Sequence, residues 1–127
     1  MSADPYHDEA QARWGDTEAY RESQRRLSGY SAEDVELAKK QAAEAVQMFL
    51  DAMTAGLPAD SPEAAAAAEA HRKAISDWWY ACSYDMQTNL AAMYLQDSRF
   101  TQHYEDVRPG LAQYVHDAIF ANALANS

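Results

Sequence analysis

A tryptophan-rich run from Ile75 to Met93 constrains the fold of this chain more than any other stretch. It contains two of the three tryptophans, the one cysteine and two of the five methionines. Burying a side chain of this size gains about 1.5–3 kcal/mol, so the run cannot stay in water. The run is the middle of the core, the wall of a ligand cleft, or both. Its apolar and aromatic members are Trp78, Trp79, Tyr80, Cys82, Tyr84, Met86, Leu90 and Met93.

The composition predicts an all-α protein. The chain of 127 residues has four glycines, four prolines and few β-branched residues, whereas alanine, the best helix former, is abundant. A chain of this length forms one domain and removes about two thirds of its unfolded surface from water. Its single cysteine excludes an internal disulfide and fits a reducing compartment, so we expect a cytoplasmic location.

Charge and motifs argue against several classes of function. A formal net charge of −10 disfavours direct binding to nucleic acid or to an anionic membrane, since both require clustered lysine and arginine. No stretch approaches the roughly 20 apolar residues of a membrane span, and the first residues lack the pattern of a signal peptide. The histidines have no zinc-site spacing, and no phosphate loop or Ser/His/Asp order is present. We expect no catalytic residue, no metal, no cofactor and no enzyme activity.

Residues 1–30 are predicted to be a weakly held amino-terminal segment. A first helix is expected over residues 4–14, and a second runs from a cap at position 16 or 17 to about position 29. The second helix offers little besides Tyr20 and Leu27 to a core, and such short helices are marginal alone. Trp14 must dock either on the main body or on a bound molecule. We expect residues 1–30 to form a mobile lid that a ligand orders, over a core of residues 31–127.

Helix start signals divide the remaining residues. Ser31 and Ser61 are favoured amino-terminal caps, and Pro62 suits the first position of the second of these helices. The small side chains of residues 64–68 would let a neighbouring helix come close. The predicted helices run from 31 to 56, from 61 through to Cys82, from Ser83 to about Gln96, from Asp97 or Ser98 through Phe100 and Tyr104, and from Pro109-Gly110 onward, with Leu111, Val115, Ala118 and Ile119 facing inward.

Two reactive side chains near the centre each have two interpretations. His71 lies one turn before Ile75 on the apolar face, so a satisfied core or cleft-wall histidine is favoured over a ligand or base. Cys82 is favoured as a small buried hydrophobe. A helix that starts at Ser83 would lower the pKa of the thiol beside it, which makes Cys82 a candidate nucleophile.

Asn89 is the polar member of the tryptophan-rich run. It is three residues after Met86 and four before Met93, so the three side chains share a helix face. A buried asparagine needs hydrogen-bond partners. The partner is either a protein group, such as a backbone carbonyl or His71, or the amide of a ligand.

Several stretches of the chain resemble the TipA-type antibiotic-recognition domain, also called the TipAS domain. The resemblance is near continuous from Ala12 to Asn122 and is carried by dispersed motifs. These are R-W-G-D-T-E-A-Y-R-E-S at 13–23, the helix start at 30–31, P-A-D-S-P-E at 58–63, H-R at 71–72, W-Y-A-C-S-Y-D-M at 79–86, M-Y-L-Q-D-S-R-F at 93–100 and P-G-L-A-Q-Y-V-H-D-A-I at 109–119.

The resemblance implies an all-α fold with a globin-like helix arrangement and no haem. It also implies that the chain binds thiopeptide antibiotics such as thiostrepton, or bulky drugs such as albicidin, in a cleft over which a mobile amino-terminal segment closes. Many members carry the domain behind a MerR-type winged-helix DNA-binding half. We therefore expect either a stand-alone binding protein or the sensor part of a regulator.

One position departs from the family pattern. In the thiostrepton-binding member, a cysteine of the central helix adds to a dehydroalanine of the drug, and Asn89 corresponds to that cysteine. The neighbouring family cysteine, seven residues earlier, matches Cys82. Because an amide cannot perform thiol addition, we expect reversible binding, with Asn89 in the cleft wall and Cys82 a minor candidate for adduct formation.

The favoured hypothesis is a monomeric module that binds an antibiotic, for sequestration or for signalling. An alternative from a different class is a protein-interaction module whose groove takes an amphipathic helix. A haem or redox globin-like protein would rest on fold analogy alone. The predicted ligand contacts are Trp14, Tyr20, His71, Ile75, Trp78, Trp79, Cys82, Tyr84, Met86, Asn89, Leu90, Met93 and Phe100.

Overall fold

The computed structural model describes residues 18–127, and the predictions for residues 1–17, Trp14 and the first helix among them, lie outside this part of the chain. Every regular element within residues 18–127 is a helix, which confirms the all-α prediction. None of these helices combines the length and apolar composition that crossing a membrane requires. The helices are α2 (Glu18–Ser28), α3 (Ala32–Thr54), α4 (Pro62–Trp78), α5 (Tyr84–Gln96), α6 (Ser98–Glu105) and α7 (Leu111–Ala125).

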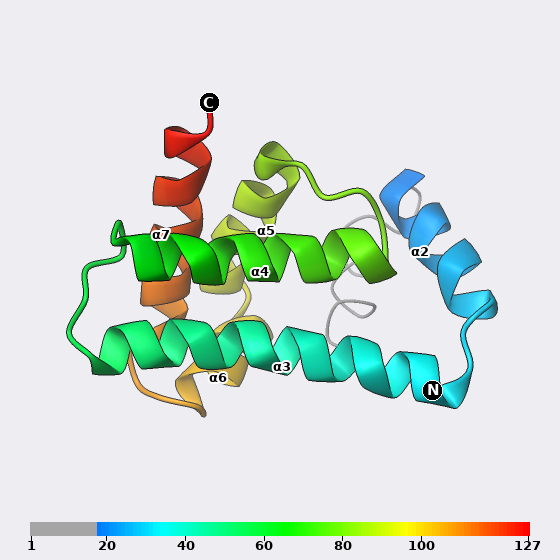
Figure 1. Cartoon of the computed structure of the whole chain (residues 1–127), viewed down its shortest axis with the longest axis horizontal. Helices are drawn as coiled ribbons and strands as arrows, with labels where there is room; N and C mark the ends of the chain where they lie inside the picture. The colour runs from blue at the N-terminus through cyan, green and yellow to red at the C-terminus, as the bar shows by residue number, and fades with distance from the viewer. Residues whose placement is uncertain (1–17) are drawn as a thin grey trace.

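The helices form two packed pairs. α3 and α4 run antiparallel side by side, and α5 and α7 pack together behind them, with α6 beneath (Figure 1). α4 also contacts α7, and α6 packs against both α5 and α7. α2 lies at the end of the molecule where α4 finishes, outside the two helix pairs (Figure 1). The fold therefore consists of a body from α3 to α7 and one outlying helix.

Side-chain caps set the starts of four helices where the sequence predicts them. The caps are Ser31, Ser61, Ser83 and Asp97, and in each the side-chain oxygen accepts a backbone N–H two or three residues ahead. Such a bond satisfies one of the donors that a helix leaves free at its amino end. At α3 the cap is reciprocal, because the Asp34 carboxylate also accepts the Ser31 N–H. These caps confirm the local prediction of the helix starts.

The last helix begins by a different device. Gly110 precedes α7 with a φ of 90°, a left-handed backbone conformation that favours glycine. Glycine has no side chain with which to cap the helix. The Glu105 carboxylate takes this role and accepts the N–H groups of Gly110 and Ala112 at 2.9 and 3.1 Å. These bonds hold the pKa of Glu105 below its usual value. The prediction that Pro109-Gly110 opens the last helix is confirmed.

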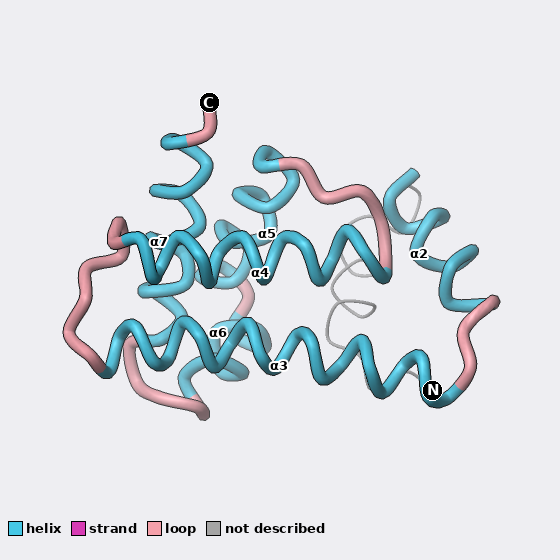
Figure 2. Tube along the Cα trace, in the orientation of Figure 1, coloured by secondary structure: helices cyan, strands magenta, loops and turns pink. Residues whose placement is uncertain are grey.

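The carboxyl end of α4 differs from the prediction. The helix was expected to continue to Cys82, but it ends at Trp78, and residues 79–83 form the connection to α5 (Figure 2). The Ser76 hydroxyl accepts the Cys82 N–H at 2.9 Å, which offers that backbone group an alternative to the helix. Ser83 also needs an extended backbone to cap α5, so the chain must leave helical geometry before it.

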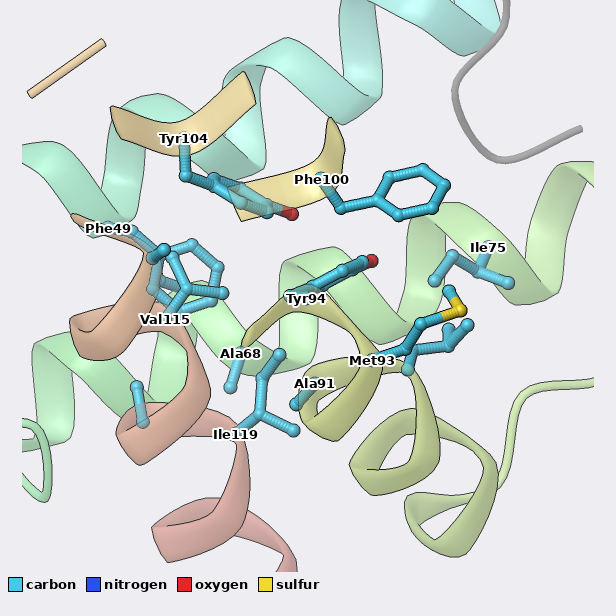
Figure 3. Close-up of a cluster of buried hydrophobic side chains, with 14 of the residues drawn as sticks. Phe49, Ala68, Ile75, Ala91, Met93, Tyr94, Phe100, Tyr104, Val115 and Ile119 are labelled. Carbon is cyan, nitrogen blue, oxygen red and sulfur yellow. The ribbon is translucent and has the colours of Figure 1, made fainter. Parts of the chain in front are cut away.

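The core lies where α3 to α7 meet. Figure 3 shows aromatic and aliphatic side chains from these five helices gathered around Tyr94. On α4, Ala64, Ala67 and Ala68 are completely buried, and the helix contacts α3 and α7. Small side chains permit this close approach, as the alanine run predicts. The inward positions of α7 are also confirmed, since Leu111, Val115, Ala118 and Ile119 are buried.

Candidate ligand-binding site

Trp78, at the end of α4, contacts α3 and the turn that follows α2. Its indole N–H donates to the Gln41 side-chain oxygen on α3 at 2.7 Å. The ring of Tyr30, just after α2, meets the Trp78 ring edge-on with centroids 5.4 Å apart, and it lies 6.1 Å from the Trp79 ring. Trp78 is half-buried, whereas Trp79 is buried. Trp78 thus keeps accessible aromatic surface, and these contacts hold its ring in one orientation.

The connection between α4 and α5 is held from within α4. The Arg72 guanidinium donates to the Cys82 carbonyl at 3.0 Å, and Ser76 accepts the Cys82 N–H. Cys82 is only 3% exposed, and its thiol contacts the Ser83 carbonyl at 3.7 Å. Cys82 therefore occupies the position of a small buried hydrophobe, which is the favoured sequence interpretation.

Tyr84 belongs to a polar cluster between α4, α5 and α7. The Arg72 guanidinium lies 4.3 Å from the centre of the Tyr84 ring and donates to Glu69 at 2.9 Å. Asn122 on α7 also donates to Glu69, at 2.7 Å. The hydrogen bond from Arg72 is the main cause that lowers the pKa of the Glu69 carboxyl, and bonds from Asn122 and Tyr84 act in the same direction. Tyr84 thus ties helices together.

His71 is fully buried in a hydrogen-bonded set with Gln87 and Tyr94. The Gln87 amide nitrogen donates to the Ala68 carbonyl at 2.8 Å and lies 2.9 Å from His71 Nδ1. A carbonyl only accepts, so the group of Gln87 that faces Ala68 must be the amide nitrogen and not the amide oxygen. The second hydrogen of this nitrogen points to His71 Nδ1, which must therefore accept it. The proton of the neutral ring is then on Nε2, which donates to the Tyr94 hydroxyl at 3.1 Å. Burial lowers the pKa of His71 to about 4.

Gln87, which sequence reasoning did not single out, takes the buried polar role that was considered for Asn89. Asn89 is exposed, so the interpretation as a buried asparagine bonded to His71 was wrong. The buried face of α5 carries Gln87, Leu90 and Tyr94, at the helical spacing of three and four residues. Asn89 falls outside this face. The spacing of Gln87 from Leu90 and Tyr94 is a signal for Gln87, but the packing of α5 on α4 decides which face is internal.

Tyr84 does not share a side of α5 with Asn89. The two positions are five residues apart, which is about 140° around the helix axis. Met86 and Met93, which are seven residues apart, are half-buried and buried. Met86, Asn89 and Met93 lie on one side of α5, away from Tyr84, as their spacing predicts. On this side, Asn89 is the residue that faces solvent.

The predicted ligand contacts separate into two groups by exposure. In the described conformation, the buried ones are core residues: His71, Ile75, Trp79, Cys82, Leu90, Met93 and Phe100. The residues with accessible surface are Tyr20, Trp78, Tyr84, Met86 and Asn89. Two open depressions formed by described residues lie elsewhere, along the start of α3 and where α3 meets α4, and none of the predicted contacts lines either.

Residues 6–122 match the model of the TipAS antibiotic-recognition domain. The chain is 44% identical over 124 residues to the HTH-type transcriptional activator TipA of Streptomyces coelicolor. This match covers 98% of the chain and 49% of the relative. The chain is also 31% identical over 114 residues to the HTH-type transcriptional activator mta of Bacillus subtilis. That match covers 90% of the chain and 43% of the relative. The chain thus spans about half the length of these curated relatives.

Two solved structures are similar in fold and sequence. One is TipAS from Streptomyces lividans in complex with the thiopeptide antibiotic nosiheptide, which is 42% identical, has a TM-score of 0.86 and covers 100% of this chain and 89% of that one. The other is the antibiotic-binding domain of a TipA-class multidrug resistance transcriptional regulator, which is 44% identical with a TM-score of 0.66 and covers 71% of this chain and 96% of that one. The chain belongs to the TipAS antibiotic-recognition domain family.

Proposed function

We propose that this chain binds bulky hydrophobic peptide antibiotics, of the thiopeptide or albicidin-like kind, without forming a covalent bond. The ligand occupies a cleft at the tryptophan-rich centre, and residues 1–30 act as its lid. The output is sequestration of the drug or, when joined to a MerR-type DNA-binding half, a transcriptional signal. As an isolated domain, we expect a cytoplasmic monomer.

One observation carries this proposal: the solved TipAS–nosiheptide complex is similar to this chain over its whole length. The chemistry of the accessible predicted residues is consistent with such a ligand. Trp78 and Met86 are half-buried and offer apolar surface, and the exposed Asn89 amide can donate and accept hydrogen bonds. Apolar walls with a few orienting polar groups are typical of ligand sites.

Nosiheptide is expected to change the tryptophan fluorescence of the protein in a saturable way. Asn89→Ala should weaken the binding about fivefold to tenfold, because it removes one hydrogen bond worth about 1 kcal/mol. The stability should not change, since the side chain is exposed. Gln113→Ala, which removes an exposed amide from α7, is the matched control and should bind like wild type. No signal from wild type at a high concentration of nosiheptide would contradict the proposal.

Binding is expected to leave the protein mass unchanged. Asn89 has no thiol, and Cys82 is buried within the connection between α4 and α5, where its N–H bonds Ser76. Intact-mass spectrometry after incubation with nosiheptide and removal of free drug should therefore return the mass of the unmodified chain. The Cys82→Ala variant is the control for any adduct that does appear. A stable adduct that this substitution abolishes would overturn the reversible mode.

A further inference from the structure

α2 is a polar helix that meets the end of α4. Its sequence, E-A-Y-R-E-S-Q-R-R-L-S, offers Leu27 as the aliphatic residue that packs partly buried against the core. Many of its charged groups pair within the helix, where Glu22 accepts from Arg25 and Arg26. Pairs within one helix support that helix but do not place it on a neighbour. Contacts between α2 and the body of the molecule are described at its junction with α4.

The carboxyl end of α4 supplies this junction. A helix leaves its last four carbonyl groups without partners inside the helix. At α4, the Ser76 carbonyl accepts from the Arg26 guanidinium and the Trp78 carbonyl accepts from the Tyr30 hydroxyl, both at 2.6 Å. Two of the free carbonyls of α4 are therefore capped by side chains from α2 and the turn that follows it.

The electrostatics of both bonds favour this arrangement. A helix carries partial negative charge at its carboxyl end, so a guanidinium there is stabilised by the helix dipole. Arg26 is also oriented by Glu22, whose carboxylate accepts from Arg26 Nε at 2.8 Å. A tyrosine hydroxyl is protonated at neutral pH and can donate, and burial raises the pKa of Tyr30 further. The Tyr30 ring meanwhile packs against both Trp78 and Trp79.

We propose that Arg26 and Tyr30 are positioning residues that hold α2 beside the tryptophan-rich site by capping the carboxyl end of α4. They act on a ligand through the placement of α2 and of the Trp78 ring, and they need not touch it. This inference rests on the proposed function, because the proposed function places the ligand at the tryptophan-rich site beside this junction.

Two pairs of substitutions separate this role from general effects. Arg26→Gln removes the guanidinium that reaches Ser76, and Arg25→Gln removes a neighbouring guanidinium that also pairs with Glu22. Tyr30→Phe removes the hydroxyl that donates to the Trp78 carbonyl. Tyr114→Phe removes a hydroxyl that donates to the Leu57 carbonyl at 3.0 Å, at the loop between α3 and α4. Each control thus deletes the same chemical group without touching the junction of α2 and α4.

Hydrogen exchange and a nosiheptide titration give two independent readouts. In Arg26→Gln and Tyr30→Phe, the amides of residues 18–28 should exchange about fivefold faster than in wild type, while those of α3 to α7 keep their protection. The affinity for nosiheptide should fall about fivefold to tenfold, as expected for one lost hydrogen bond. Arg25→Gln and Tyr114→Phe should match wild type in the exchange of residues 18–28 and in affinity, within about twofold.

Each remaining outcome counts against a distinct claim. Unchanged exchange in residues 18–28 would show that the two side chains do not hold α2 and would overturn the inference. Faster exchange with unchanged affinity would show that the placement of α2 is irrelevant to the ligand, which also overturns it. If wild type does not bind nosiheptide, the proposed function fails and the ligand role fails with it, while the exchange experiment still decides whether Arg26 and Tyr30 hold α2.

Discussion

Acidification from pH 6.5 to pH 4 is expected to cost the protein about 3 kcal/mol of unfolding free energy through His71 alone. The pKa of His71 is about 4 in the folded protein, below the ordinary value of 6.5. Between these values the unfolded state binds more protons than the folded state. The stabilisation is therefore complete above pH 6.5 and is lost as the pH falls toward 4.

The physical cause is the environment of the imidazole. Its ring is fully buried, edge-on to Phe49 and Tyr94, and its Nδ1 accepts from Gln87. Protonation would place a charge in the core and turn Nδ1 into a donor that faces another donor. The set also joins α4 to α5, so loss of this arrangement should loosen the helices that carry the candidate site.

Urea unfolding at pH 7.5 and at pH 4.5 measures this effect. Wild type should lose about 2–3 kcal/mol more between the two conditions than the His71→Gln variant, whose side chain does not titrate. His103→Gln, which removes an exposed histidine from α6, should keep the wild-type difference. Carboxylates with lowered pKa values, such as Glu69 and Glu105, add acid sensitivity that all three proteins share. An equal loss in His71→Gln and wild type would show that this ring is not the source.

Phe49→Ala is expected to lower the unfolding free energy by about 3–5 kcal/mol, the usual range for a buried phenylalanine. Phe49 lies on α3, has no exposed surface and packs among side chains from several helices (Figure 3). Its truncation removes the transfer free energy of the ring and leaves a cavity that a body of packed helices cannot fully close.

Urea unfolding monitored by circular dichroism tests this expectation. Leu37→Ala, on the same helix but at a position that is 46% exposed, is the matched control and should change stability by at most about 0.5 kcal/mol. Phe49→Leu should fall between the two, because it keeps most of the apolar volume. A loss below about 1 kcal/mol in Phe49→Ala would mean that the core is not organised around this ring.

The local chemistry of the sequence was sufficient for most of the helices. Ser31, Ser61, Ser83 and Asp97 cap helices because their side chains bond backbone groups only two or three residues away, so no distant contact is needed. The inward positions of α7 follow from the helical spacing of apolar residues in the same way. Membership in the antibiotic-recognition family was also readable from the dispersed motifs alone.

Only the tertiary structure decided which residues near the tryptophan-rich centre are internal. Asn89 and Gln87 are both polar residues of α5, and the packing of α5 on α4 buries the second and exposes the first. The end of α4 at Trp78 depends on bonds to Ser76, Arg26 and Tyr30, two of which come from more than forty positions away. Long-range contacts of this kind depend on how helices cross, and a local pattern of residues does not specify that geometry.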